Sequence, residues 1–505
     1  MKMVKSLLLG SAAGLVAMAG AQAADLPVKA KPVQYVKICS LYGAGFYYIP
    51  GTDTCIKIGG FVRAEWNFNA AGSFGPITAT NWTRANQTET TRTRIVVSFD
   101  TRSQTAYGTL RSYGRGGWQW SSGDYQVGGS QGASSGTSAA TWSGAALGSS
   151  STTYFDRAFV QLAGFTAGKT QSFFDFIALS SYSNQTPWMQ MDTGGSGTPV
   201  LAYTAQFGNG LSATLSLEDA TEQALPVVSV GTGAGTNNLG LGSDIGTNRA
   251  NDGVPDIVAN VRIDQAWGSA QLSGAMHRLA VSYYPGSVAG AFASPGDTWG
   301  AAVQGGLKIN LPMLGKGDDL YLGAAYCSGA TRYCSNPAGG VRGSGAFYAL
   351  RDGNNVGFGN LSDGYYLSTG AGTGGSIEKA RAYNFAAAIQ HNWNAQWNTS
   401  LYGGYLKYEA NSAAVNAACA AGTAGGTAAV LGAGCRDWSA WQIGTRTMWR
   451  PVANLDLSVD ILYHQINSAL KGTTTAGAVG TPALLTFGDA NAWAGIFRVQ
   501  RNFWP

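Results

Sequence analysis

Apolar and polar residues alternate one by one over many short stretches of this chain. The clearest stretch is Cys55 to Asn69. One parity is apolar and reads Ile56, Ile58, Gly60, Val62, Ala64, Trp66 and Phe68. The other parity is largely polar and reads Lys57, Gly59, Phe61, Arg63, Glu65, Asn67 and Asn69. A period of two predicts a β-strand with two unlike faces.

Seven further stretches predict pairs of strands joined by short turns. Their turns carry Gly, Asn, Asp or Pro, as in Gly208-Asn209-Gly210 and in Pro451 to Asn454, and these residues favour tight turns. The stretches are approximately 91–115, 155–170, 200–218, 256–278, 299–326, 382–409 and 438–465. With the opening strand and a closing strand near 491–503, we expect about sixteen strands. Longer segments rich in Gly, Ser, Thr, Ala and Asn separate the hairpins.

The polar face of these strands decides between a soluble and a membrane fold. It carries Arg63, Glu65, Arg92, Arg94, Asp100, Arg111 and Arg157. The dry core of a β-sandwich or β-propeller could not bury so many charges without a large desolvation cost. Apolar faces against lipid and polar faces around water remove that cost. We therefore expect an all-β transmembrane antiparallel barrel with short periplasmic turns and long extracellular loops, wide enough to keep an aqueous channel.

The first residues predict export. Lys2 and Lys5 precede an apolar stretch from Leu7 to Ala19, and Ala21-Gln22-Ala23 gives a small-x-small cleavage pattern. We expect a signal peptide over 1–23, a short periplasmic segment over 24–54 and the barrel domain over 55–505. Without the signal peptide the cations fall from 32 to 30 against 27 acids, a net charge of +3. So small an excess argues against a nucleic-acid surface, so no nucleic-acid partner is expected.

Six cysteines in an exported chain indicate disulfides. Sequence proximity favours Cys39–Cys55, Cys327–Cys334 and Cys419–Cys435, although six cysteines allow 15 connectivities. No histidine lies near any pair and no CxxC occurs. We therefore expect no metal site and no cofactor.

The chain also contains sets of residues that could be catalytic. The most suggestive set is Asp456, Ser458, Asp460 and His464, which share one parity of a predicted strand. Side chains two apart on a strand point outward in parallel and need not converge, so a polar lumen wall is the simpler interpretation. The string GxSxG is centred on Ser130 and on Ser134, but both lie in a Gly/Ser-rich segment without the strand–turn–helix context of a nucleophile elbow. We therefore expect that this protein is not an enzyme. An outer-membrane barrel hydrolase is the weaker alternative.

Three segments resemble the alphaproteobacterial branch of the general porins. They are VKICSLYGAGFYYIPGTDTCIKIGGFVRAEW (Val36–Trp66), RAFVQLAGFTAGKTQSFFDF (Arg157–Phe176) and FRVQRNF (Phe497–Phe503). The resemblance implies a sixteen-stranded barrel in the cell outer membrane, a homotrimer, and passive permeation of ions and small hydrophilic solutes. Outer-membrane lipid and lipopolysaccharide are the expected surroundings. The sequence departs from this family at its end. Such barrels usually finish on an aromatic residue that the assembly machinery reads; here Phe503 fits that role, but Trp504 and Pro505 follow it.

The resemblance also implies that the third loop folds inward and narrows the pore. Here that loop would start after Gly168-Lys169 and run to about Thr198. Its acidic residues, Asp175 and Asp192, would face cations on the wall. The predicted constriction comprises Arg63, Arg92, Arg94, Arg111, Arg157, Lys169, Asp175 and Asp192. A channel that prefers sugars or anions remains open as an alternative, since lumen aromatics favour sugars and clustered arginines favour anions.

Overall fold

The computed structural model describes most of the chain after residue 36. The described residues are 37–69, 89–122, 149–185, 189, 192, 197–230, 253–281, 284–285, 292–293, 295–335, 346–352, 355–367, 376–413, 415–416, 437–469, 471–474 and 485–503. Among them, no helix combines the length and the apolar character needed to cross a membrane.

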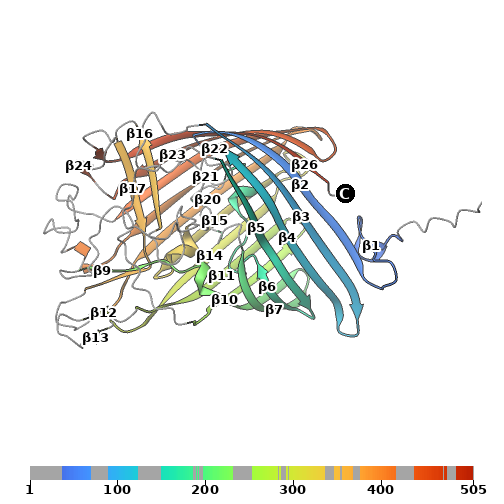
Figure 1. The fold of residues 1–505 in the computed structure, drawn as a ribbon, viewed down its shortest axis with the longest axis horizontal. Helices are drawn as coiled ribbons and strands as arrows, with labels where there is room; N and C mark the ends of the chain where they lie inside the picture. The colour runs from blue at the N-terminus through green and yellow to red at the C-terminus, as the bar shows by residue number, and fades with distance from the viewer. Residues whose placement is uncertain are drawn as a thin grey trace, which may run out of the picture.

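Sixteen strands form a closed antiparallel barrel (Figure 1). Each strand pairs with the next one along the chain, and the last pairs with the first through Phe61–Phe68 and Gly495–Asn502. The strands are β2 (Cys55–Phe68), β3 (Glu89–Thr105), β4 (Gly108–Ser122), β5 (Ser149–Leu162), β6 (Phe165–Thr170), β7 (Thr198–Gly208), β8 (Leu211–Glu218), β10 (Asp256–Gln265), β11 (Gly268–Leu279), β14 (Thr298–Asn310), β15 (Asp319–Ser328), β20 (Arg381–Asn392), β21 (Trp397–Glu409), β22 (Trp438–Val452), β23 (Leu455–Asn467) and β26 (Ala490–Asn502). The predicted hairpins and closing strand are confirmed.

The two rims of the barrel differ in how the strands are connected. Short turns lie at the right of Figure 1, together with the C-terminus, and long connections lie at the left. The turn between β7 and β8 shows the chemistry of the short rim: Asn209 (φ 47°) and Gly210 (φ 74°) both adopt the left-handed backbone of a two-residue hairpin turn. Small strands lie in the long connections: β9 (Val227–Val230), β12 (Tyr284–Pro285), β13 (Phe292–Ala293), β16 (Ala346–Asp352), β17 (Asn355–Leu361), β18 (Gly364–Leu367), β19 (Glu378–Lys379), β24 (Gly472–Thr474) and β25 (Leu485–Phe487).

Side-chain exposure separates the outer face from the inner face. On β2 the apolar side chains are exposed, with Trp66 45% and Phe68 51% exposed. The polar side chains of Glu65 and Asn67 are buried. This orientation, with apolar side chains outside and ionised side chains inside, is the one predicted from the alternation. Aromatic residues near strand ends, which are typical of membrane interfaces, also lie on the outer face: Trp66, Phe68, Trp397, Tyr405 and Trp493.

A small lobe precedes β2 at the short-turn rim. Its strand β1 (Tyr47–Tyr48) pairs with the start of β2, and a disulfide joins Cys39 to Cys55. The second predicted disulfide, Cys327–Cys334, is also present, so both of these pairings are confirmed. The third predicted pair, Cys419 and Cys435, lies outside the described residues, as do the two GxSxG strings.

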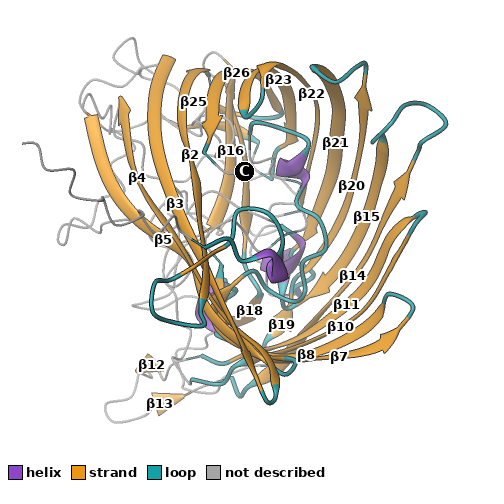
Figure 2. Cartoon of the chain, turned by 90° about the vertical axis from the view of Figure 1, so that its right-hand side faces the viewer, coloured by secondary structure: helices purple, strands orange, loops and turns teal. Residues whose placement is uncertain are grey.

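The inner face is not uniformly polar. On β15 and on β20 to β22 the inward parity is largely small, apolar or aromatic and fully buried, as at Tyr321, Ala386, Tyr402, Leu406 and Ala440. These side chains form one buried cluster with residues of the long connection between β6 and β7. Figure 2 looks along the barrel from the short-turn rim and shows the helical segments of the connections inside the ring of strands. Arginines of the inner wall are therefore most numerous on β2–β5, whereas the inner faces of β20 and β21 are largely apolar.

Candidate pore constriction

The described part of the connection between β6 and β7 (residues 171–185, 189, 192 and 197, loop 3) folds into the lumen. Near its start, the backbone N–H of Phe173 donates to Glu218 on β8 (2.9 Å). The Asn260 side chain on β10 donates to the carbonyl of Phe173 (2.5 Å), and Gln271 on β11 donates to the carbonyl of Asp175 (3.0 Å). All three wall residues have the inward parity of their strands. The inward-folded third loop is thus confirmed.

Loop 3 then follows the inner wall around to β23 and β26. Tyr182 donates to Asp319 on β15 (2.6 Å), and Ser400 on β21 donates to the Tyr182 carbonyl (2.6 Å). The backbone N–H of Asn184 donates to Asp460 on β23 (2.6 Å), and Arg498 on β26 donates to the Asn184 carbonyl. Buried polar groups need such partners. Since these anchors run from β8 to β26, the β2–β5 wall is left facing the remaining lumen.

That wall carries a cluster of arginines around one carboxylate. Glu65 accepts from Arg92 and, at 2.7 Å, from Arg498, and lies 3.7 Å from Arg63. Arg94 lies in electrostatic range of Glu65 and donates to Gln119 (2.7 Å). Three guanidinium groups around one carboxylate leave the cluster positive. The predicted residues Arg63, Arg92 and Arg94 therefore come together on the lumen side.

Arg111 belongs to a separate cluster nearer the short-turn rim. It contacts Asp100 (3.0 Å) and Gln161 (3.0 Å). Arg102 binds the same carboxylate at 2.8 Å. Arg94 and Arg102 are eight residues apart on β3, which corresponds to about 27 Å along an extended strand. Arg111 is thus inside the lumen but distant from the Glu65 cluster.

A bulge in β5 places Asp156 beside Arg157 on the lumen side. The register of the β4–β5 pairing shifts between Arg115 and Gly116. As a result, Asp156 and Arg157 of β5 both lie opposite Arg115. Phe155 before the bulge and Val160 after it point outward, at 54% and 47% exposed. An extra residue in one strand re-aims its side chains, and here both Asp156 and Arg157 face inward. Arg157 lies in electrostatic range of Asp175 on loop 3.

The remaining two predicted residues have opposite outcomes. Asp192 is buried and lies, with Asp175, in electrostatic range of the lumen-facing Tyr321. Lys169 does not join them. It pairs with Pro199 of β7, which is exposed on the outer face, and it shares the parity of the outward residues Phe165 and Ala167. The prediction for Lys169 is wrong because directly opposed residues of paired strands point to the same face.

Two of the residues considered for catalysis, Ser458 and Asp460, anchor loop 3. Ser458 bonds to the Asn184 side chain (2.9 Å) and Asp460 accepts from Asn184, Gln185 and Tyr402. Asp456 instead pairs with Arg450 near the short-turn rim (2.8 Å). The same-parity arrangement was visible in the sequence, but its purpose depends on loop 3, which is far away along the chain.

Several lumen residues were not predicted as site residues. Arg102, Arg115, Arg446 and Arg498 all lie on the inward parity of their strands. The alternation indicates this parity for Arg498, which the apolar Phe497 and Val499 flank; Thr, Ser or Gly flank the other three arginines and give a weaker signal. Glu218 and Asp319 were also missed; both sit at the ends of their strands, where alternation gives the weakest signal.

Comparison with known proteins is consistent with this geometry. A family profile described as "Porin subfamily" matches residues 25–496. The chain is 30% identical over 335 residues to porin Omp2b of Brucella suis biovar 1 (strain 1330), covering 65% of this chain and 75% of that protein. It is 31% identical over 336 residues to porin Omp2a of Brucella ovis, covering 65% of this chain and 80% of that protein.

Among solved structures, the outer membrane channel DcaP of Acinetobacter baumannii has a similar fold. The TM-score is 0.52 with 12% sequence identity, covering 90% of this chain and 99% of that chain. This likeness concerns the fold alone. A closed sixteen-stranded barrel, an ionised inner wall and the family match lead to one conclusion: the chain belongs to the porin subfamily and forms a passive diffusion channel in the cell outer membrane.

Proposed function

We propose that the narrowest part of the water path lies between the β2–β5 wall and loop 3, and that charge across this gap selects among solutes. The observation that carries the proposal is that loop 3 crosses the lumen from Glu218 on β8 to Arg498 on β26, whose guanidinium group also binds Glu65 of the β2–β5 wall. Cations on one side and carboxylates on the other create a transverse field, which orients water and dipolar solutes and disfavours apolar ones. Permeation requires no chemical step, and solutes follow their own gradients.

Opposite charge changes on the two sides of the gap test this proposal. Arg157→Gln should shift the reversal potential in a salt gradient towards cation preference, and Asp175→Asn should shift it towards anion preference. Both shifts should be several millivolts, because each variant changes the local field where ions pass most closely. The measurement is the zero-current potential of reconstituted channels in a planar bilayer.

Arg450→Gln is the matched control, since Arg450 pairs with Asp456 and is exposed near the short-turn rim. Its reversal potential should equal that of the parent. Parent-like values in both test variants, or shifts of the same sign, would place the constriction elsewhere.

A channel that prefers anionic solutes is the second candidate. It is favoured by the Glu65 cluster, where Arg63, Arg92 and Arg498 surround one carboxylate. The sign of the parent's reversal potential in the same experiment distinguishes the two candidates.

Three further assignments complete the proposal. We propose that residues 1–23 are removed on export, that 24–54 form a periplasmic segment, and that three copies assemble in the membrane. The disulfide Cys39–Cys55, at the start of β2, supports the periplasmic assignment, because disulfides form in the oxidising periplasm. Membership of the porin subfamily supports the trimer, and a native mass in mild detergent would measure it.

A further inference from the structure

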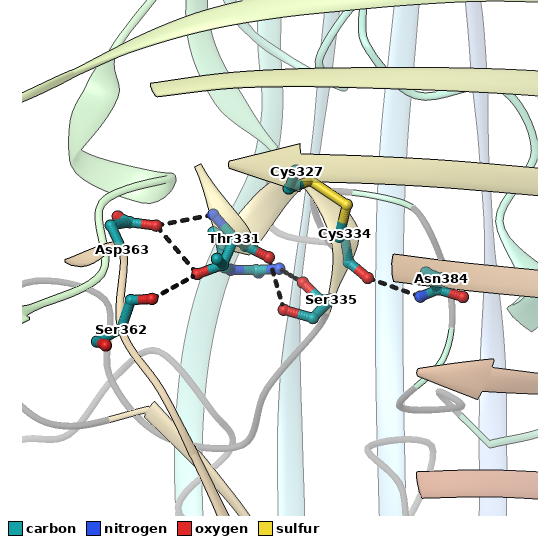
Figure 3. Close-up of a disulfide and its surroundings, with 8 residues drawn as sticks. Cys327, Thr331, Cys334, Ser335, Ser362, Asp363 and Asn384 are labelled. Carbon is teal, nitrogen blue, oxygen red and sulfur yellow. Dashed lines mark hydrogen bonds between the residues drawn. A yellow bond between two sulfur atoms is a disulfide. The ribbon is translucent and has the colours of Figure 1, made fainter. Parts of the chain in front are cut away.

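A second long connection also folds into the barrel. The described part of the connection between β15 and β20 (residues 329–335, 346–352, 355–367 and 376–380, the inner connection) begins with the 3-10 helix η6 (Thr331–Cys334), all of whose residues are buried. The disulfide Cys327–Cys334 joins η6 to β15 (Figure 3). Cys327 has the inward parity of β15, so this bond holds η6 on the lumen side of the wall. The disulfide was predicted from sequence proximity, whereas the placement of η6 inside the barrel was not.

Three contacts fix η6 across the inner wall. The Asn384 side chain on β20 donates to the carbonyl of Cys334 (2.6 Å; Figure 3). The hydroxyl of Tyr333 donates to Asp256 on β10 (2.7 Å). The Tyr333 ring packs edge-on against Phe174 of loop 3, with centroids 4.8 Å apart. The inner connection therefore touches loop 3 as well as the wall.

Asp363 joins two long connections, the inner connection and the connection between β8 and β10. Its Oδ1 accepts from the backbone N–H of Thr331 (2.7 Å) and from the Thr331 hydroxyl (3.0 Å; Figure 3). Its Oδ2 accepts from the backbone N–H of Leu225 (2.8 Å), which belongs to the connection between β8 and β10. Asp363 has no exposed surface. A carboxylate buried so deeply requires partners of this kind.

His277 links Asp363 to the barrel wall. Its Nδ1 lies 2.7 Å from Asp256 Oδ1, and its Nε2 lies 3.6 Å from Asp363 Oδ2. Asp256 begins β10 and His277 lies near the end of β11, so both are at the long-connection rim. The imidazole, which has no exposed surface, stands between a wall carboxylate and a loop carboxylate. This pairing fixes the depth at which the inner connection sits.

We propose that the inner connection is a second size-selecting element of the channel, in series with loop 3, with Asp363 as its positioning residue. Space that η6 and residues 361–366 occupy inside the barrel is closed to solutes, and these residues are all buried. Loop 3 acts deeper in the lumen, where it reaches Arg498 and the Glu65 cluster. Solutes entering from the long-connection rim therefore pass the inner connection first.

Polymer exclusion measured separately from each side tests this element. Polyethylene glycols of graded size are added to one chamber of a planar bilayer, and the largest polymer that still lowers the conductance is recorded. Asp363→Asn should raise the conductance by tens of per cent and admit larger polymers from the long-connection side. The cut-off from the short-turn side and the reversal potential should not change, because the bonds of loop 3 to Asp460 and Arg498 and the arginines of the wall remain in place.

Asp297→Asn is the matched control, since Asp297 pairs with Arg278, the neighbour of His277, at a half-exposed site. It should behave as the parent. The double variant Cys327→Ser/Cys334→Ser releases η6 independently and should widen the same side. Folded channels of Asp363→Asn with the parent's cut-off from both sides would overturn the proposal. Should Asp363→Asn fail to fold, an unchanged cut-off in the cysteine double variant would overturn it equally.

Discussion

Replacing Glu65 with glutamine is expected to lower the free energy of unfolding of the barrel by about 3 to 5 kcal/mol. The Glu65 side chain is buried, and Arg63, Arg92 and Arg498 turn towards it. Glutamine keeps the shape and can still accept a hydrogen bond. It removes the negative charge that the three guanidinium groups share, so they repel one another in a partly dehydrated site. The measurement is the temperature or the denaturant concentration at which half of the folded barrel is lost. The folded barrel is compact and migrates faster than the unfolded chain in gel electrophoresis.

Glu409→Gln supplies the control for this prediction. Glu409 pairs with Lys407, whose side chain is 47% exposed, and exposed pairs contribute about 0 to 1 kcal/mol. Its midpoint should differ little from that of the parent. A Glu65→Gln midpoint equal to that of Glu409→Gln would show that the arginine cluster does not depend on Glu65.

The second large effect is expected on the outer face. Leu215 lies in the middle of β8, is 59% exposed and neighbours Tyr203 and Ala259 on the adjoining strands. Leu215→Arg should cost about 2 to 4 kcal/mol, because it places a cation against hydrocarbon. The folded yield in lipid vesicles should fall accordingly.

Thr204→Arg is the matched control because Thr204 lies at nearly the same depth on the opposite face. Its hydroxyl pairs with that of Thr214, on the inward parity of β8 (2.9 Å). An arginine there can reach water in the lumen, so the folded yield should stay close to that of the parent. Equal losses in both variants would contradict the assignment of outer and inner faces.

The strands were predictable because their signal is local. Alternation over Cys55–Asn69 depends only on neighbouring residues facing lipid or the lumen in turn, and β2 occupies Cys55–Phe68 as expected. The turns were equally local, since Asn209 and Gly210 supply the left-handed backbone that the hairpin needs. Barrel closure followed from the number of strands and from the absence of a dry core in the pattern.

The constriction was predicted less completely, because the pattern does not give depth along a strand. Arg94 and Arg111 share the inward face, but the register places Arg94 beside Gln119 and Arg111 beside Arg102. Arg157 shares the inward parity of Phe159 and Gln161, but its neighbour Asp156 faces the lumen beside it only through the bulge opposite Arg115. The same pattern misassigned Lys169, whose direction is set by its pairing with Pro199.

Contacts between distant segments were beyond the reach of the sequence. The apolar inner side chains Tyr321, Ala386 and Tyr402 resemble lipid-facing residues until loop 3 is seen to cover them. Asp363 likewise lies in a long polar segment and shows its role only through Thr331, Leu225 and His277. Such residues depend on tertiary packing, which no local periodicity encodes.

The central claim is that water fills the path between the arginine wall and loop 3. Single-channel recording of the purified protein in a planar bilayer tests this claim most directly. We predict ohmic current steps whose conductance rises in proportion to the conductivity of the salt solution, without nucleotide or any added cofactor. A folded barrel that leaves the bilayer insulating would contradict the account.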